Sequence, residues 1–123
     1  MSRIQTLTLV VELAEQRRDE ALSEHASRVR ELQAAQDQMN QLQGYVAEAQ
    51  ARWAQRGSQG MDVSLLLHHR QFMQKIDHAM EFQRGVLAQR DELIERGQAQ
   101  VYAAERDVAG LRSYTERNLD ALN

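Results

Sequence analysis

Proline and cysteine are absent from this 123-residue sequence, and aromatic residues are scarce. Because there is no Pro, no residue imposes a break on a helix. Because there is no Cys, disulfides, Cys-based zinc sites and thiol nucleophiles are excluded. One Trp, two Phe and three Tyr are too few to fill the thick core of a globular domain. These absences favour a chain of long helices with a thin core.

The sequence also lacks an excess of one charge and lacks long apolar runs. Its 15 basic and 18 acidic residues give a formal net charge of −3. A nucleic-acid-binding protein usually presents a basic face, so no nucleic-acid partner is expected. No apolar run approaches the roughly 18–20 residues that a membrane span needs. The polar start, residues 1–5, lacks the apolar core of a secretory signal, and we expect a soluble cytoplasmic protein without membrane insertion.

The residues that are present favour helices, and their spacing favours a coiled coil. Gln, Arg, Glu, Ala and Leu are abundant, and all are good helix formers. Alternating steps of four and three residues from Leu7 select a heptad seam in the first half of the chain. The seam consists of Leu7, Val11, Ala14, Arg18, Ala21, His25, Arg28, Leu32, Ala35, Met39, Leu42, Val46, Ala49 and Trp53.

The middle of this first seam is polar. Arg18, His25 and Arg28 occupy seam positions, while Leu22 and Val29 lie just beside them. We expect a stutter-like drift of the helix here that turns Leu22 and Val29 into the contact. Protonation of His25 on the seam could loosen the contact between the helices.

One break separates the first seam from a second one. The break is Gly57-Ser58-Gln59-Gly60, in which Gly57 can adopt the left-handed conformation after a helix. Asp62 is a good N-cap for the helix that follows. Ser2 and Gln5 have the spacing of a capping box at the start of the chain. The second seam is Ile76, Met80, Gln83, Leu87, Arg90, Ile94, Gly97, Val101, Ala104, Val108, Leu111, Thr115, Asn118 and Leu122.

The pattern therefore predicts an all-α fold, a long antiparallel two-helix coiled coil that forms a single domain. Helix 1 is expected at about 3–56, the turn at about 57–61 and helix 2 at about 62–122, because a short loop favours antiparallel neighbours. Folding back about residue 59 would place Trp53 near Leu65, and likewise the pairs Leu42 and Ile76, Leu32 and Leu87, and Leu7 and Leu111.

The pattern gives little support for an enzyme. A two-helix hairpin offers its Ser, His and Asp residues no concave pocket that excludes water. Asp77, His78 and Glu81 are the best metal candidates, but dinuclear carboxylate sites use the reverse Glu-x-x-His order across four helices. We expect no catalytic residue, no metal site and no cofactor.

A second apolar stripe exceeds what a hairpin needs. It consists of Phe72, Ile76, Ala79, Gln83 and Val86, beside the second seam and sharing Ile76 with it. Exposed contiguous apolar surface is typical of partner sites. Alternatively, Phe72 and Ile76 are core residues near the turn that Trp53 covers. The pattern leaves both interpretations open.

Several segments carry a resemblance to a known family. They are residues 10–15 (Val-Val-Glu-Leu-Ala-Glu), Gln59-Gly60, Leu66 followed by Phe72, Ile76 and Ala79, then Gln83, and residues 108–112 (Val-Ala-Gly-Leu-Arg). In order and spacing the chain resembles the flagellar export protein family FliJ. Members of this family usually continue into a longer charged C-terminal segment.

The resemblance implies a function in the flagellar type III export apparatus. Members of the family act as a stalk-like coiled coil within the hexameric export ATPase, and they contact the cytoplasmic part of the membrane export gate and export chaperones. The implied location is the cytoplasm, with peripheral association to the inner membrane through the apparatus. Carried onto this chain, the gate-binding residues are Phe72, Ile76, Ala79 and Gln83. We place ATPase contact at the open end of the hairpin, at Arg3, Leu7, Val11, Leu111, Arg112 and Leu122.

Two other functions remain alternatives. The equivalent stalk of a virulence-type secretion system would share the architecture. A homo-oligomeric scaffold would bury the second stripe against another copy of the chain. A DNA-associated zipper is disfavoured because the sequence lacks a basic region.

Overall fold

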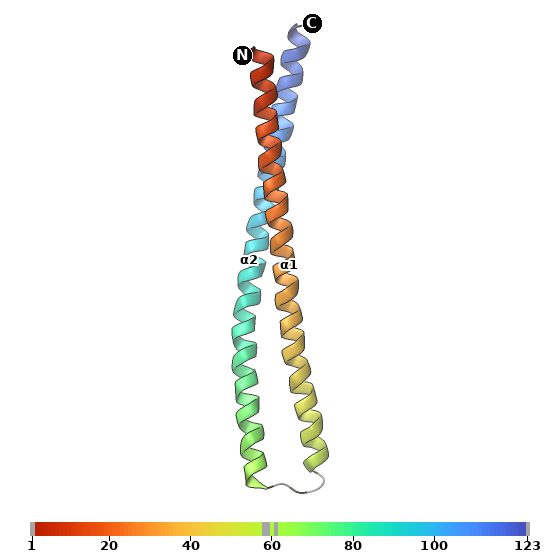
Figure 1. The fold of residues 1–123 in the computed structure, drawn as a ribbon, viewed down its shortest axis with the longest axis vertical. Coiled ribbons are helices and arrows are strands. Elements are labelled where there is room, and N and C mark those ends of the chain that lie inside the picture. Colours follow the sequence, from red (N-terminus) through yellow and green to blue (C-terminus); the bar gives the residue numbers. More distant parts are fainter. Residues whose placement is uncertain (1, 58–59, 61, 123) are drawn as a thin grey trace. The chain divides into compact units, whose positions relative to one another are not determined.

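Two long helices make up the computed structural model, which describes residues 2–57, 60 and 62–122. Helix α1 spans Arg3–Gly57 and helix α2 spans Val63–Leu122. The helices pack against each other as a helical hairpin, and the described residues contain no strand (Figure 1). The expected all-α hairpin is confirmed. Three residues of the expected turn, Ser58, Gln59 and Met61, lie outside the described residues.

The hairpin divides into two compact units, each with segments from both helices. The first unit combines Met1–Arg30 with Glu92–Asn123, and the second consists of Glu31–Asp91. Within the first unit, the N-terminal part of α1 lies beside the C-terminal part of α2 (Figure 1). The two units are described separately below.

The sequence signals at the helix starts act as expected. The backbone N–H of Gln5 donates to Ser2 Oγ at 3.2 Å, and the Ser2 N–H donates to Gln5 Oε1 at 3.0 Å, which completes a capping box. At α2, the Ser64 N–H donates to Asp62 Oδ1 at 2.6 Å. Asp62 is therefore the N-cap.

The end of α1 differs from the expectation. Gly57 is the last helical residue and does not take the left-handed conformation predicted for it. The positive φ, 82°, belongs to Gly60 instead. The backbone thus remains helical through Gly57, and Gly60 supplies the conformation that residues with a Cβ rarely adopt.

In the second unit, the predicted seams form the contact between the helices. Every seam residue is buried or half-buried, and Ala35, Met39 and Ala49 are 5–7% exposed. On α2 the seam extends toward the helix start by two residues, His69 and Met73, which follow the same spacing. The seam residues of this unit are Leu32, Ala35, Met39, Leu42, Val46, Ala49 and Trp53 of α1, and His69, Met73, Ile76, Met80, Gln83, Leu87 and Arg90 of α2.

In the first unit the seam keeps its heptad spacing through the polar stretch, so the expected stutter is wrong. Arg18, His25 and Arg28 are half-buried, whereas Leu22 and Val29 are 42% and 46% exposed. Long Arg side chains can cover the contact with their aliphatic stems while their guanidinium groups reach outward. No drift of the helix is needed to accommodate them.

His25 fits the seam of the first unit for a different reason. It faces Gly97 of α2, and a Cβ built on Gly97 would lie 2.8 Å from His25 Nδ1. The ring therefore occupies space that only a glycine leaves open.

At the end of the α2 seam, Leu122 is 64% exposed although a seam position was expected for it.

The register agrees with the expected one to within about one helical turn. The Trp53 ring stacks on His69, with ring centroids 4.1 Å apart and planes at 11°, four residues beyond Leu65, which lines a pocket together with Trp53. The hydrogen bond of Gln83 to Ala35, described below, joins residues that the expected register places opposite each other.

Candidate partner-binding surfaces

An apolar row flanks the seam of α2 in the second unit. Leu65, Phe72, Ala79 and Val86 recur every seven residues beside the seam. Phe72 and Leu65 are each 39% exposed, and Ala79 is half-buried. We call Phe72, Ile76 and Ala79 the Phe72 patch. Because Ile76 is itself a seam residue, the patch joins the helix contact to the outer surface.

Gln83, expected in this group, lies in the helix contact. Its side chain is 6% exposed. Its Nε2 donates to the carbonyl oxygen of Ala35 at 2.8 Å and to Gln38 Oε1 at 3.2 Å. A buried amide needs such partners. Gln83 thus holds α2 to α1 and adds no exposed surface to the Phe72 patch.

An open pocket adjoins the Phe72 patch within the second unit. Its volume is about 280 Å³, and Phe72 belongs to both features. The stacked pair Trp53 and His69 forms part of its wall. We call it the aromatic pocket, and it is lined by Ala49, Arg52, Trp53, Arg56, Leu65, His68, His69 and Phe72.

The residues expected to contact the ATPase lie in the first unit, and most of them hold the two helices together. Leu7, Val11 and Leu111 are half-buried seam residues. Arg3 Nη2 donates to Asn118 Oδ1 at 2.7 Å. The side chains of Leu7, Val11 and Leu111 stabilise the unit but leave little of their own surface for a partner, whereas Arg3 is exposed.

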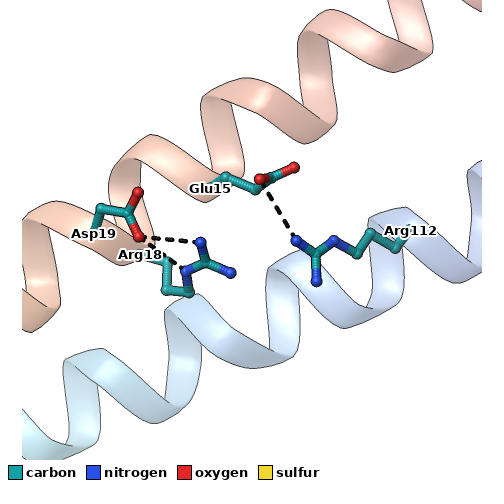
Figure 2. A network of polar contacts seen from close by, with 4 residues as sticks. All are labelled: Glu15, Arg18, Asp19 and Arg112. Carbon is teal, nitrogen blue, oxygen red and sulfur yellow. Dashed lines mark hydrogen bonds and ion pairs between the residues drawn. The ribbon is translucent and has the colours of Figure 1, made fainter.

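Arg18 and Arg112, which lie at the helix contact of the first unit, each form an ion pair (Figure 2). Arg112 of α2 reaches Glu15 of α1 at 3.5 Å. Nearby, Arg18 Nε and Nη2 both donate to Asp19 Oδ1, at 3.1 and 3.0 Å. Pairs with this much solvent access contribute about 0–1 kcal/mol each. The pair of Arg112 with Glu15 joins α1 to α2 and favours their observed pairing without dominating its stability, whereas Arg18 and Asp19 both belong to α1.

The exposed apolar surface of the first unit comes from other residues. Ile4, Leu9, Val10 and Leu13 of α1 are 39–47% exposed. Leu119 and Leu122 of α2 are 37% and 64% exposed. We call these six residues the terminal surface. A groove of about 380 Å³ adjoins it, lined by Val10, Leu13, Ala14, Arg17, Arg106, Asp107, Gly110 and Leu111.

The sequence contained a signal for the terminal surface that our expectation did not use. Phe72 of helix 2 is apolar but lies outside the predicted seam. Leu9, Val10 and Leu13 of helix 1 are apolar and lie outside their seam in the same way. Apolar residues that a narrow seam cannot cover remain exposed to water. Applied to both helices, this criterion would have identified Leu9, Val10 and Leu13 of the terminal surface.

Among the described residues, no group of three or more His, Asp or Glu side chains is placed to hold a metal ion. Over the same residues, neither helix has a segment that is apolar enough to span a membrane.

The fold and its surfaces define a class of protein, a coiled-coil-like hairpin that carries surplus apolar side chains in both of its units. The chain belongs to the FliJ family, because the family model described as "Flagellar FliJ protein" matches residues 2–121. No curated protein and no solved structure matches the chain. Family membership makes this a flagellar export-associated protein, and the family is a non-catalytic component of the export apparatus.

Proposed function

We propose that this chain is the stalk-like component of the flagellar type III export apparatus that binds and promotes the export ATPase ring. The chain also links the ATPase to the cytoplasmic part of the membrane export gate and to export chaperones. This places it in the cytoplasm, peripherally associated with the inner membrane through its partners. No catalytic residue of its own is required.

One observation carries the proposal. Each unit carries exposed apolar side chains beside the seam, Phe72 in one and Leu9, Val10 and Leu13 in the other. The Phe72 patch supports gate binding, and the terminal surface supports ATPase binding. Two separate surfaces are what a protein that connects two partners requires.

Gate binding is tested by truncating Phe72. Aromatic side chains at the centre of an interface often contribute 2 kcal/mol or more, so Phe72→Ala should weaken binding of the gate's cytoplasmic part by roughly tenfold or more. Isothermal titration calorimetry with the purified gate domain measures this change. Helicity should persist, because Phe72 lies outside the seam and is 39% exposed.

Leu67→Ala is the matched control for this experiment. Leu67 is also on α2 and 51% exposed, but it lies five residues before Phe72 and therefore on another helix face. Its truncation should leave gate affinity unchanged. Equal losses in both variants, or no loss in either, would remove the gate-binding assignment from the Phe72 patch.

A further inference from the structure

The aromatic pocket has an apolar wall that is open to solvent. Trp53 of α1 faces Leu65 and Phe72 of α2 across it, and the last two are each 39% exposed. Trp53 is held in place by its stacking on His69. A preformed site of this kind suits one large apolar side chain of a partner, because little ordering of the pocket is required for binding.

The rim of this pocket carries positive charge that the described residues do not neutralise. Arg52 and Arg56 lie four residues apart and so share a face of α1. Neither forms an ion pair or hydrogen bond within the described part of the chain. His68 and His69 complete the rim, and no carboxylate lines the pocket.

Two other grooves lack this combination. The groove beside the terminal surface contains Asp107 together with Arg17 and Arg106, so its charge is mixed. A second groove on α2 is lined by Gln71, Gln74, Lys75 and His78 and has no large apolar side chain. A third contains a single guanidinium group, that of Arg3, which already donates to Asn118, whereas the aromatic pocket joins its apolar wall to two guanidinium groups.

We propose that the aromatic pocket binds an acidic amphipathic segment of a protein partner. The segment inserts an apolar anchor between Trp53 and Phe72, and its carboxylates accept hydrogen bonds from Arg52 and Arg56. Guanidinium groups match carboxylates in a bidentate geometry that an ammonium group cannot provide. The inference rests on the proposed function in one respect, because Phe72 lies in both surfaces and the export gate is therefore taken to supply the segment.

The single tryptophan of the chain gives a direct readout of this pocket. Replacing Trp53 biosynthetically with 5-fluorotryptophan yields one ¹⁹F resonance from inside the site. Titrating the folded full chain with the purified cytoplasmic part of the gate should shift this resonance. The affinity should fall steeply between low and physiological salt, because exposed charge pairs are screened.

The variant Arg52→Glu plus Arg56→Glu tests the charge of the partner. Gate affinity should fall at least tenfold, and most of its salt dependence should disappear. Arg70→Glu plus Arg84→Glu is the matched control, with the same change of net charge on exposed residues of the same unit that do not line the pocket. Should the first variant lose helicity, Arg52→Gln plus Arg56→Gln is expected to lower the affinity at least threefold.

The results of these experiments distinguish a failure of the acidic-segment inference from a failure of the proposed gate binding on which it rests. If Phe72→Ala abolishes gate binding while the Arg52 and Arg56 variants bind normally, the acidic segment is refuted and the gate assignment stands. If no variant changes gate binding, or no binding occurs, both are refuted. A ¹⁹F shift on concentrating the chain alone would assign the pocket to a second copy and overturn the inference.

Discussion

His25 and Gly97 illustrate how single residues set the fit between the helices of the first unit. The two residues occupy facing seam positions, and the imidazole fills the space above the glycine. His25 Nδ1 is buried and has no hydrogen-bond partner among the described residues. Shape therefore accounts for this polar residue in the seam better than hydrogen bonding does.

The substitution Gly97→Ala should destabilise the protein. Alanine favours a helix by about 1 kcal/mol over glycine. At Gly97, however, the added Cβ would lie 2.8 Å from the imidazole, and such overpacking costs about 1–3 kcal/mol. We expect the net free energy of unfolding to fall by about 1 kcal/mol, measured by urea denaturation followed by circular dichroism.

Gly85→Ala is the control, because a Cβ at Gly85 meets no atom within 4 Å. It should stabilise the protein by up to about 1 kcal/mol. Adding His25→Ala to Gly97→Ala should remove the clash and recover part of the loss. If Gly97→Ala proved as stabilising as Gly85→Ala, the proposed fit between ring and glycine would be wrong.

In the two helices, the sequence predicted the contact faces well and their register to within about one turn. The four-and-three spacing identified nearly all of the seam residues, because an apolar stripe must face the other helix. A seven-residue repeat tolerates several alignments with similar burial, so periodicity alone does not determine the register more closely than this. Contacts such as Gln83 with Ala35 select among these alignments, and they exist only in three dimensions.

The same distinction applies to the candidate surfaces. Phe72 could be identified from the sequence because it is apolar and lies outside the narrow seam. The aromatic pocket could not, because it requires Arg52 and Arg56 of α1 to lie across from Leu65 and Phe72 of α2. That arrangement depends on a register known to better than one helical turn, which the sequence pattern did not determine.

We expect Gln83 to determine how α1 and α2 align while adding little to the free energy of unfolding. The Ala35 carbonyl lies within α1 and has its helical hydrogen bond, so it loses only a second donor when Gln83 becomes Leu. Leu has a similar size and suits a seam position, and we expect Gln83→Leu to change the free energy of unfolding by less than about 1 kcal/mol. Single polar seam residues can fix register and oligomeric state, so this variant should populate additional species.

Thermal unfolding and light scattering together check this expectation. Gln83→Ala serves as the comparison, because it leaves a cavity as well as removing the amide and should be the less stable variant. A Gln83→Leu protein that is strongly destabilised yet remains one species would contradict the register role.

In the whole molecule, we propose one partner surface for each unit. The Phe72 patch and aromatic pocket belong to Glu31–Asp91, and the terminal surface belongs to the segments before and after it. This division predicts that substitutions in one unit impair one interaction and leave the other intact.

If the terminal surface binds and promotes the export ATPase, as we propose, the chain should change the rate of ATP hydrolysis by the purified ATPase. Adding the wild-type chain should raise the rate to saturation. The variant Val10→Ser plus Leu13→Ser should raise it much less, whereas Leu22→Ser, at an exposed position outside the terminal surface, should act like the wild type. A rate that does not respond to the wild-type chain, or that responds equally to all three proteins, would contradict the account.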